Sequence, residues 1–232
     1  MNERVKALLF CAMALVAAIP ASAQVGHDPG KSPYADLEYS QEFTLLGGYL
    51  RTRHDPAGIL PNSRPMFGVR YEATLTGPLA ISADIISAFG DRNVVDPTKP
   101  AATRNIGTQS NAVVAADLAA ALNLTGTRSW HSLVPQIRGG IGLVRSAAKD
   151  DSTGYAFGTP FAFVYGAGVK YVPGGRFQLR ADVTDRVFKQ NYTDAYYRFA
   201  SDNTVVVPST TARSFYTHHT ALTLGVSYLF AR

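Results

Sequence analysis

The last stretch of the chain, from Tyr216 to Phe230, alternates apolar and polar side chains. From residue 222 on, every second residue is apolar or aromatic: Leu222, Leu224, Val226, Tyr228 and Phe230. Successive side chains of a strand point to opposite faces, so this pattern predicts a β-strand with one apolar face. The stretch is longer than an ordinary soluble strand, and about ten tilted strand residues can cross a bilayer. An apolar face with aromatic residues at its ends suits the lipid-facing wall of a barrel.

The same alternation recurs upstream and predicts eight strands, near 42–52, 65–76, 79–89, 110–122, 134–146, 159–172, 177–189 and 216–230. The connections at 77–78, 123–133 and 173–175 are short or moderate, whereas those at 53–64, 90–109, 147–158 and 190–215 are long and polar. Short turns at one end and long loops at the other are typical of outer-membrane barrels. We therefore predict an all-β fold: an eight-stranded antiparallel up-and-down transmembrane β-barrel with short periplasmic turns and long extracellular loops.

Within such a barrel, parity separates a lipid-facing set from an interior set. The lipid-facing positions carry almost no charge, whereas the opposite parity holds nine charged residues: Arg70, Glu72, Asp84, Asp117, Arg138, Lys170, Arg180, Asp182 and Arg186. Eight strands leave an interior only wide enough for side chains, and buried charges must be paired. We expect these nine residues to form an ion-pair network that closes the lumen. A polar conduit or a proton relay is the alternative for the same residues.

The N-terminal part predicts export. Residues 1–23 have a basic start, an apolar core at 7–19 and the small-residue sequence Ala21-Ser22-Ala23, which together predict a signal peptide cleaved after Ala23. Residues 24–40 contain glycine and proline without a clear period and are predicted to be a flexible periplasmic leader, followed by the barrel domain at 41–232. The single cysteine, Cys11, lies inside the signal peptide, so the mature chain is predicted to form no disulfide.

The chain has a formal net charge of +5 without a basic cluster, which argues against a nucleic-acid partner. The whole pattern resembles the small eight-stranded outer-membrane barrels, the transmembrane domain of OmpA-like proteins and their relatives. Residues 179–186, Leu-Arg-Ala-Asp-Val-Thr-Asp-Arg, are similar to the penultimate strand of that family. The resemblance implies a monomer in the cell outer membrane, in contact with its lipid and lipopolysaccharide. It also implies that the barrel-assembly machinery reads an assembly signal at Leu222, Leu224, Val226, Tyr228 and Phe230.

One constellation bears on catalysis. His218 and Thr220 weakly resemble the His-x-Ser motif of outer-membrane lipid A deacylases, with Asp185 as the carboxylate that a triad needs. His218 and His219 are neighbours in a strand and therefore point to opposite faces, so we predict no metal site there and no cofactor. We expect a non-enzymatic integral barrel with a structural or surface-interaction role. The alternatives are a lipid A-modifying hydrolase at His218 and Thr220, and a periplasmic, lipocalin-like carrier of a lipophilic ligand.

Overall fold

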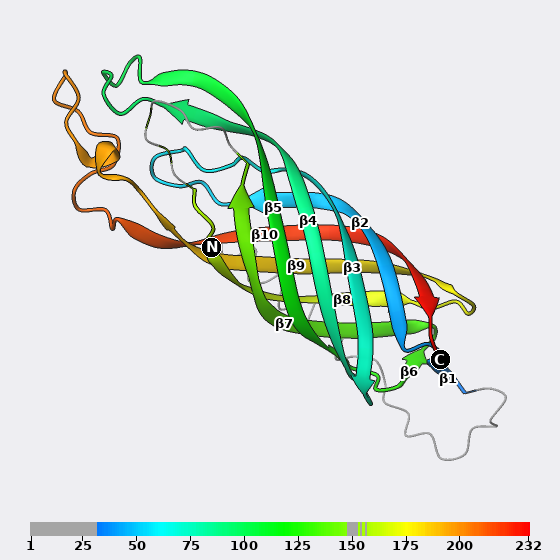
Figure 1. The fold of residues 1–232 in the computed structure, drawn as a ribbon. Helices are drawn as coiled ribbons and strands as arrows, with labels where there is room; N and C mark the ends of the chain where they lie inside the picture. The colour runs from blue at the N-terminus through cyan, green and yellow to red at the C-terminus, as the bar shows by residue number, and fades with distance from the viewer. Residues whose placement is uncertain (1–31, 148–152, 154, 156) are drawn as a thin grey trace, which may run out of the picture. The chain divides into compact units, whose positions relative to one another are not determined.

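The computed structural model describes residues 32–147, 153, 155 and 157–232. The predicted signal peptide, its cleavage site after Ala23 and most of the predicted leader therefore lie outside the described residues. Figure 1 shows long antiparallel strands that form a barrel. The long strands are β2 (Gln41–Thr52), β3 (Arg64–Thr76), β4 (Leu79–Val95), β5 (Asn105–Asn123), β7 (Leu133–Ser146), β8 (Phe161–Tyr171), β9 (Phe177–Asn191) and β10 (Ser214–Phe230).

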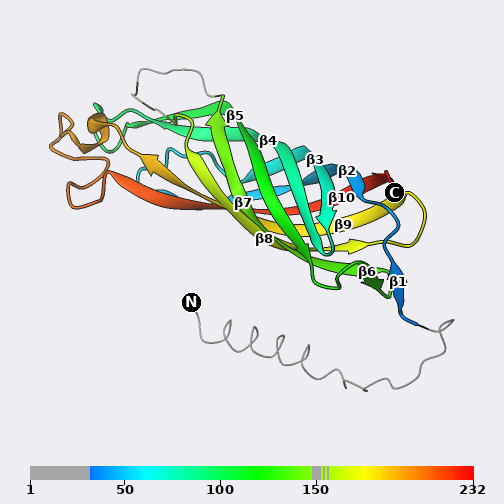
Figure 2. The same cartoon turned by 60° about the horizontal axis from the view of Figure 1, so that its bottom comes forward.

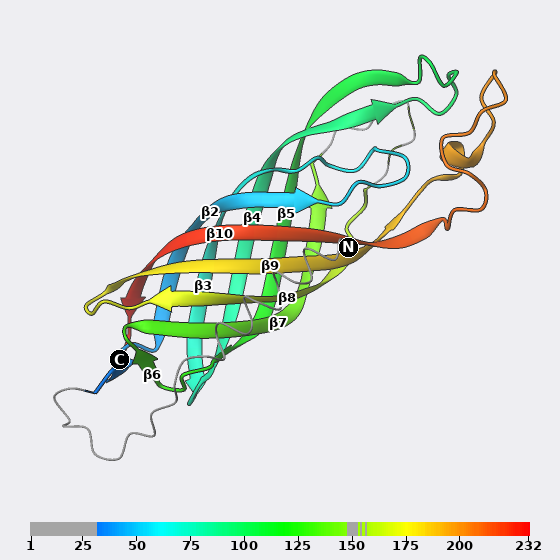
Figure 3. The same cartoon turned by 180° about the vertical axis from the view of Figure 1, so that it is seen from behind.

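The barrel closes between its first and last long strands. Each long strand pairs with the next along the chain, and β10 pairs with β2 from His219↔Thr52 to Phe230↔Gln41. Figure 3 shows β10, in red, between β2 and β9. The prediction of an eight-stranded antiparallel barrel is thus confirmed. Within the described part of the chain, no helix is long and apolar enough to cross a bilayer.

Parity separates the two faces of the wall as the sequence predicts. The outward side chains of β10 from Leu222 to Tyr228 are between 41% and 67% exposed, whereas their neighbours Thr223 and Ser227 are buried in the barrel. Aromatic side chains form a belt near the short-turn end, where Phe177, Tyr228 and Phe230 have ring centroids 5.5–6.4 Å apart. This belt and the apolar wall above it match the surface that a bilayer requires.

The hairpin of β4 and β5 is longer than the sequence predicts. The expected strands at 79–89 and 110–122 continue to Val95 and begin at Asn105, with a register shift between Val94 and Val95. The extra residues include the apolar Val94, Val95 and Ile106, but these do not alternate with polar residues, so periodicity does not detect the extension. The guanidinium of Arg64 holds this ribbon by donating to the carbonyl oxygens of Asp91, at 2.7 Å, and Asn111, at 2.5 Å.

Part of the predicted flexible leader is ordered. Within residues 24–40, β1 (Tyr34–Asp36) pairs antiparallel with β6 (Arg128–Trp130), a short strand inside the predicted turn at 123–133. Figure 2 shows both short strands at the end of the barrel where the C-terminus lies. Backbone pairing, rather than an apolar period, orders this segment. We call residues 33–40 the strap.

Candidate functional site

The lumen is the candidate functional site because all nine predicted interior charges lie buried within it. They come from every long strand except β2 and β10. A tenth charge, Glu42 on β2, is 5% exposed and joins them. Among the described residues, no group of three or more histidine, cysteine or acidic side chains is arranged to hold a metal ion.

The half of the network nearer the short turns is built around two glutamates. The ammonium of Lys170 lies 3.1 Å from Glu42 and 2.5 Å from Glu72. The Arg180 Nη1 lies 2.6 Å from Glu42 and 3.5 Å from Glu72, so each glutamate is shared by two cations. Gln136 donates to Glu72 at 2.8 Å, and the amide of Gln178 donates to Glu42. Neutral amides thus occupy carboxylate lone pairs that the two cations leave open.

The middle of the network is built around two aspartates. Arg70 forms a two-pronged pair with Asp84, both contacts 2.8 Å, and also reaches Asp182 at 3.2 Å. Arg138 donates to Oδ2 of Asp84 at 2.8 Å, the oxygen that also accepts from Nη2 of Arg70. The Nε of Arg180 lies 2.9 Å from Asp182, so Arg180 connects the middle of the network to the glutamates below. Planar guanidinium groups suit such bidentate, shared contacts.

Farther from the short turns, Arg186 lies 2.9 Å and 2.7 Å from one oxygen of Asp117 through its Nε and Nη2. With Glu42 included, five cations and five carboxylates face one another in the lumen. Glu42 was not among the predicted interior charges, although its parity matches that of the inward positions of its strand. Its carboxylate is what makes the formal charge of this group zero.

Glycines make room for the network. A Cβ on Gly168 would lie 2.1 Å from the Asp182 carboxylate, whereas a Cβ on Gly139 would meet nothing within 4 Å. We therefore expect Gly168→Ala to lower the free energy of unfolding by about 1–3 kcal/mol because the extra methyl displaces Asp182. Gly139→Ala on the outer face should be nearly neutral. Urea titration of the two variants in lipid vesicles checks this, and equal stabilities would contradict the proposed packing around Asp182.

Above the ion pairs, toward the long loops, apolar side chains form a buried cluster in the lumen. On β4 the next inward residue after Asp84 is the apolar Ile86, and on β9 the next inward residue after Arg186 is Phe188, so both strands change from charged to apolar along the lumen. We call this buried set the apolar layer: Leu50, Leu60, Met66, Ile86, Ala88, Val113, Ala115, Val144, Phe157, Ala162, Phe188 and Ala221. An apolar constriction of this kind opposes hydration of a channel.

The long loops fold over the lumen on a second buried cluster. This loop cluster consists of Ala57, Ile59, Val95, Tyr192, Tyr196 and Val207. The Tyr192 hydroxyl donates to Asp55 at 2.6 Å and accepts the backbone N–H of Ala57 at 3.1 Å, which joins the first long loop to the last. The 3₁₀ helix Asp194–Tyr197 supplies Tyr196 to the same cluster.

Electrostatic contacts also hold the loops together. The guanidinium of Arg92 lies 3.8 Å from the ring centroid of Tyr155, and burial raises the pKa of Tyr155 to about 12. The hydroxyl of Thr204 and the backbone N–H of Ala101 both donate to Asp202. These donors hold the pKa of Asp202 down at about 2 because they stabilise its ionised form. At neutral pH Tyr155 is therefore neutral and Asp202 is ionised, and in these states both groups make the contacts that hold the loops together.

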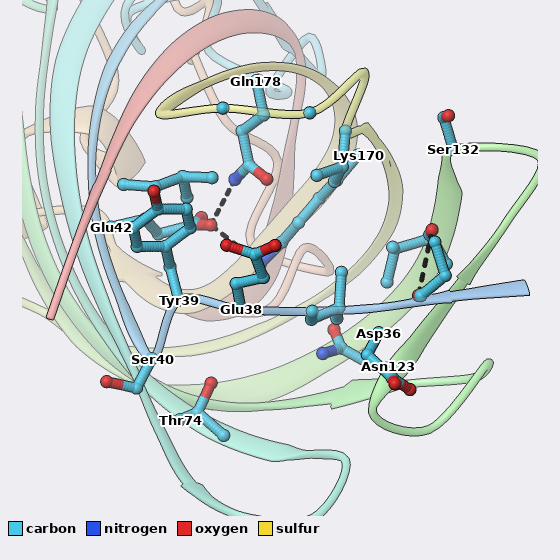
Figure 4. A pocket seen from close by; sticks show the side chains of 18 of the residues that line it. Asp36, Glu38, Tyr39, Ser40, Glu42, Thr74, Asn123, Ser132, Lys170 and Gln178 are labelled. Carbon is cyan, nitrogen blue, oxygen red and sulfur yellow. Dashed lines mark hydrogen bonds and ion pairs between the residues drawn. The ribbon is translucent and has the colours of Figure 1, made fainter. Parts of the chain in front are cut away.

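At the opposite end, the strap crosses the mouth of the barrel. Its start pairs with β6 beside β7, and its end donates from Ser40 N–H to the Ala231 carbonyl at 2.8 Å beside β2 and β10. Three strands lie between β7 and β2 in either direction around the barrel, so the strap spans the opening. Beneath it lies a pocket of about 220 Å³, which Figure 4 shows from close by. Glu42, Lys170 and Gln178 form its floor, so the network begins directly under the strap.

The candidate catalytic residues lie on the outer face of the wall. Asp185 lies 2.6 Å from Nδ1 of His218, and it accepts hydrogen bonds from Tyr165 at 2.8 Å and Thr220 at 3.0 Å. In a triad the nucleophilic hydroxyl contacts the imidazole, whereas here Thr220 donates to the carboxylate. His219 instead points into the lumen, where its ring stacks on Phe188 at 4.6 Å. The structure thus brings Asp185 and His218 together but does not join Thr220 to the base.

Comparison with known proteins agrees with this architecture. Residues 9–230 match the family described as outer membrane protein beta-barrel domain. Neisserial surface protein A shares 14% identity with a TM-score of 0.47, and the alignment covers 86% of this chain and 98% of that one. The outer membrane protein OprG from Pseudomonas aeruginosa shares 12% identity with a TM-score of 0.49, covering 84% of this chain and 98% of that one. No curated protein sequence matches the chain.

Proposed function

Because the chain belongs to the outer membrane protein beta-barrel domain family, we propose that it is a non-enzymatic integral outer-membrane protein with a closed lumen. In this proposal the barrel anchors a folded set of extracellular loops and passes little solute. Its role is structural or lies in contacts that the loops make at the cell surface. The observation that carries the proposal is the stacking of a neutral ion-pair network beneath an apolar layer.

The interior supports closure at three levels. The carboxylates and cations already pair with one another at 2.5–3.5 Å, so water or ions that entered between them would have to replace these contacts. The side chains of the apolar layer offer permeating ions no polar contacts, and the buried polar groups at this level are few, among them His219 against Phe188. The loop cluster and the strap then cover the two ends. A proton relay through the same charges would have to continue across the apolar layer.

A periplasmic, lipocalin-like carrier is a weaker explanation of the same barrel. Such a carrier needs an apolar interior cavity and an outer wall that water can solvate. Here the wall exposes large apolar side chains such as Phe67, Leu224 and Phe163, whereas the lumen contains the charges.

Planar-bilayer recording of the purified monomer tests the closed lumen. We expect no steady conductance from the wild type. Phe188→Ser, which removes one of the two phenylalanine side chains of the apolar layer, should give more frequent openings, whereas Phe163→Ser on the outer wall should not. Steady conductance through wild-type monomers would overturn the proposal and assign the charges to a pore lining.

A further inference from the structure

A group of polar residues interrupts the lipid-facing wall. Asp185 lies at an outward position of β9, between Val183 and Val187 at the neighbouring outward positions. With Tyr165, His218 and Thr220 it forms what we call the rim cluster, joined by contacts of 2.6–3.0 Å. Ionisable groups are costly on a membrane-facing surface, so their presence there points to a function.

The rim cluster lies at the level of lipid head groups. His218 stands ten positions from Tyr228, which belongs to the aromatic belt near the short turns. At about 3.3 Å per residue and about 40° of tilt, ten positions rise about 25 Å, the height of the apolar band of a barrel. Tyr165 and Tyr216 are exposed aromatic residues of the other interface. Since the long loops lie outside the cell, this interface faces the outer leaflet.

The geometry of His218 leaves one ring nitrogen for a ligand. Its Nδ1 is engaged by Asp185, whose two oxygens also accept from Tyr165 and Thr220. These contacts fix the orientation of the ring through a second layer of hydrogen bonds. The side chain of His218 is 46% exposed, so Nε2 is the nitrogen that an incoming group can reach.

Two cations flank the cluster on neighbouring strands. Arg51 on β2 faces Thr220 across the ladder, and Lys189 on β9 faces Tyr216. Both are exposed at outward positions, one on each side of β10. Lys189 also lines a hollow of about 380 Å³. The apolar side chains of Leu222 and Leu224 continue the same face toward the membrane centre.

We propose that the rim cluster, with Arg51 and Lys189, binds a phosphate group of the glycolipid in the outer leaflet. His218 contacts Asp185 through Nδ1 and presents Nε2 to the phosphate. Arg51 and Lys189 supply charge-assisted hydrogen bonds from either side. The acyl chains of the lipid then lie along the apolar wall below. The inference rests on the location of the barrel in the outer membrane and is independent of the closed lumen.

Native mass spectrometry of the full, detergent-solubilised protein tests this site. The probes are diphosphoryl lipid A, the same lipid after enzymatic dephosphorylation, and phosphatidylglycerol. We expect retention of diphosphoryl lipid A over the other two. His218→Gln and Lys189→Gln should each weaken that retention about tenfold, as the loss of a hydrogen bond to a charged group predicts. Lys99→Gln, which removes an exposed cation of an extracellular loop, is the matched control and should leave retention unchanged.

Heat-modifiability on a gel shows that each variant is folded. Equal loss of binding in Lys99→Gln would indicate nonspecific charge attraction and would overturn the assigned site. Equal retention of dephosphorylated lipid A would exclude the phosphate as the ligand, and equal retention of phosphatidylglycerol would exclude the glycolipid. Unchanged retention in His218→Gln and Lys189→Gln would likewise overturn the inference. None of these results depends on the conductance of the lumen, so the lipid site and the closed lumen are tested independently.

Discussion

Replacing Arg180 with alanine is expected to lower the free energy of unfolding by about 3–5 kcal/mol. The Arg180 guanidinium is buried and pairs with Glu42, Glu72 and Asp182. Its removal leaves three carboxylates in the lumen with fewer cations, and an unpaired buried charge costs more than the pair contributes. Urea titration in lipid vesicles, followed by the heat-dependent gel shift, measures the effect.

A double-mutant cycle identifies the partner. Asp182→Asn should recover part of the loss in the Arg180→Ala background, with a coupling energy of about 0.5–3 kcal/mol. Arg128→Ala is the matched control because Arg128 pairs with Asp36 at 2.8 Å on the surface, where both side chains are more than half exposed. That pair should contribute at most about 1 kcal/mol. Similar losses for Arg180→Ala and Arg128→Ala would mean that the lumen is hydrated and that its charges are screened.

Replacing Leu224 with arginine is expected to destabilise the barrel by about 2–4 kcal/mol, the cost of an arginine near the middle of the bilayer. Leu224 is 67% exposed on the outer wall, and it lies four positions above the Tyr228 belt. The same change alters one residue of the predicted assembly signal. Folding yield in the outer membrane and unfolding in purified vesicles separate the effect on assembly from the effect on stability.

Ser201→Arg is the matched control for Leu224→Arg because Ser201 is exposed in the last long loop. It should leave stability within about 0.5 kcal/mol of the wild type. A wild-type stability for Leu224→Arg would show that this face of β10 does not contact lipid.

Periodicity in the sequence predicted the barrel because lipid and lumen impose opposite demands on alternate residues. The outward apolar set from Leu222 to Tyr228 and the inward position of Arg180 both follow from this rule. The pairing of individual charges could not be predicted, since it depends on which side chains reach across the lumen. Arg70 and Asp182, for example, come from strands on different parts of the wall and are 112 residues apart.

Segments without a regular alternation of apolar and polar residues could not be predicted from the sequence. The strap is ordered by backbone pairing with β6, and the upper part of the β4–β5 hairpin has no alternation of apolar and polar residues. The apolar layer was missed for another reason: inward residues such as Ile86 and Phe188 share parity with the charges, and only their height on the wall separates them. The contact of Thr220 with Asp185, rather than with His218, depends on rotamers that strand patterns do not specify.

The seam between β2 and β10 sets the order in which the barrel can form. It joins Gln41 to Phe230, residues near opposite ends of the barrel domain, whereas every other ladder between the long strands joins long strands that follow one another in the chain. Closing so long a loop costs chain entropy before any of the seam hydrogen bonds form, and high contact order slows folding. The hairpins can therefore assemble first, and closure awaits the last strand. The strap bond from Ser40 to Ala231 can form only after that step, so we expect it to slow reopening of the seam.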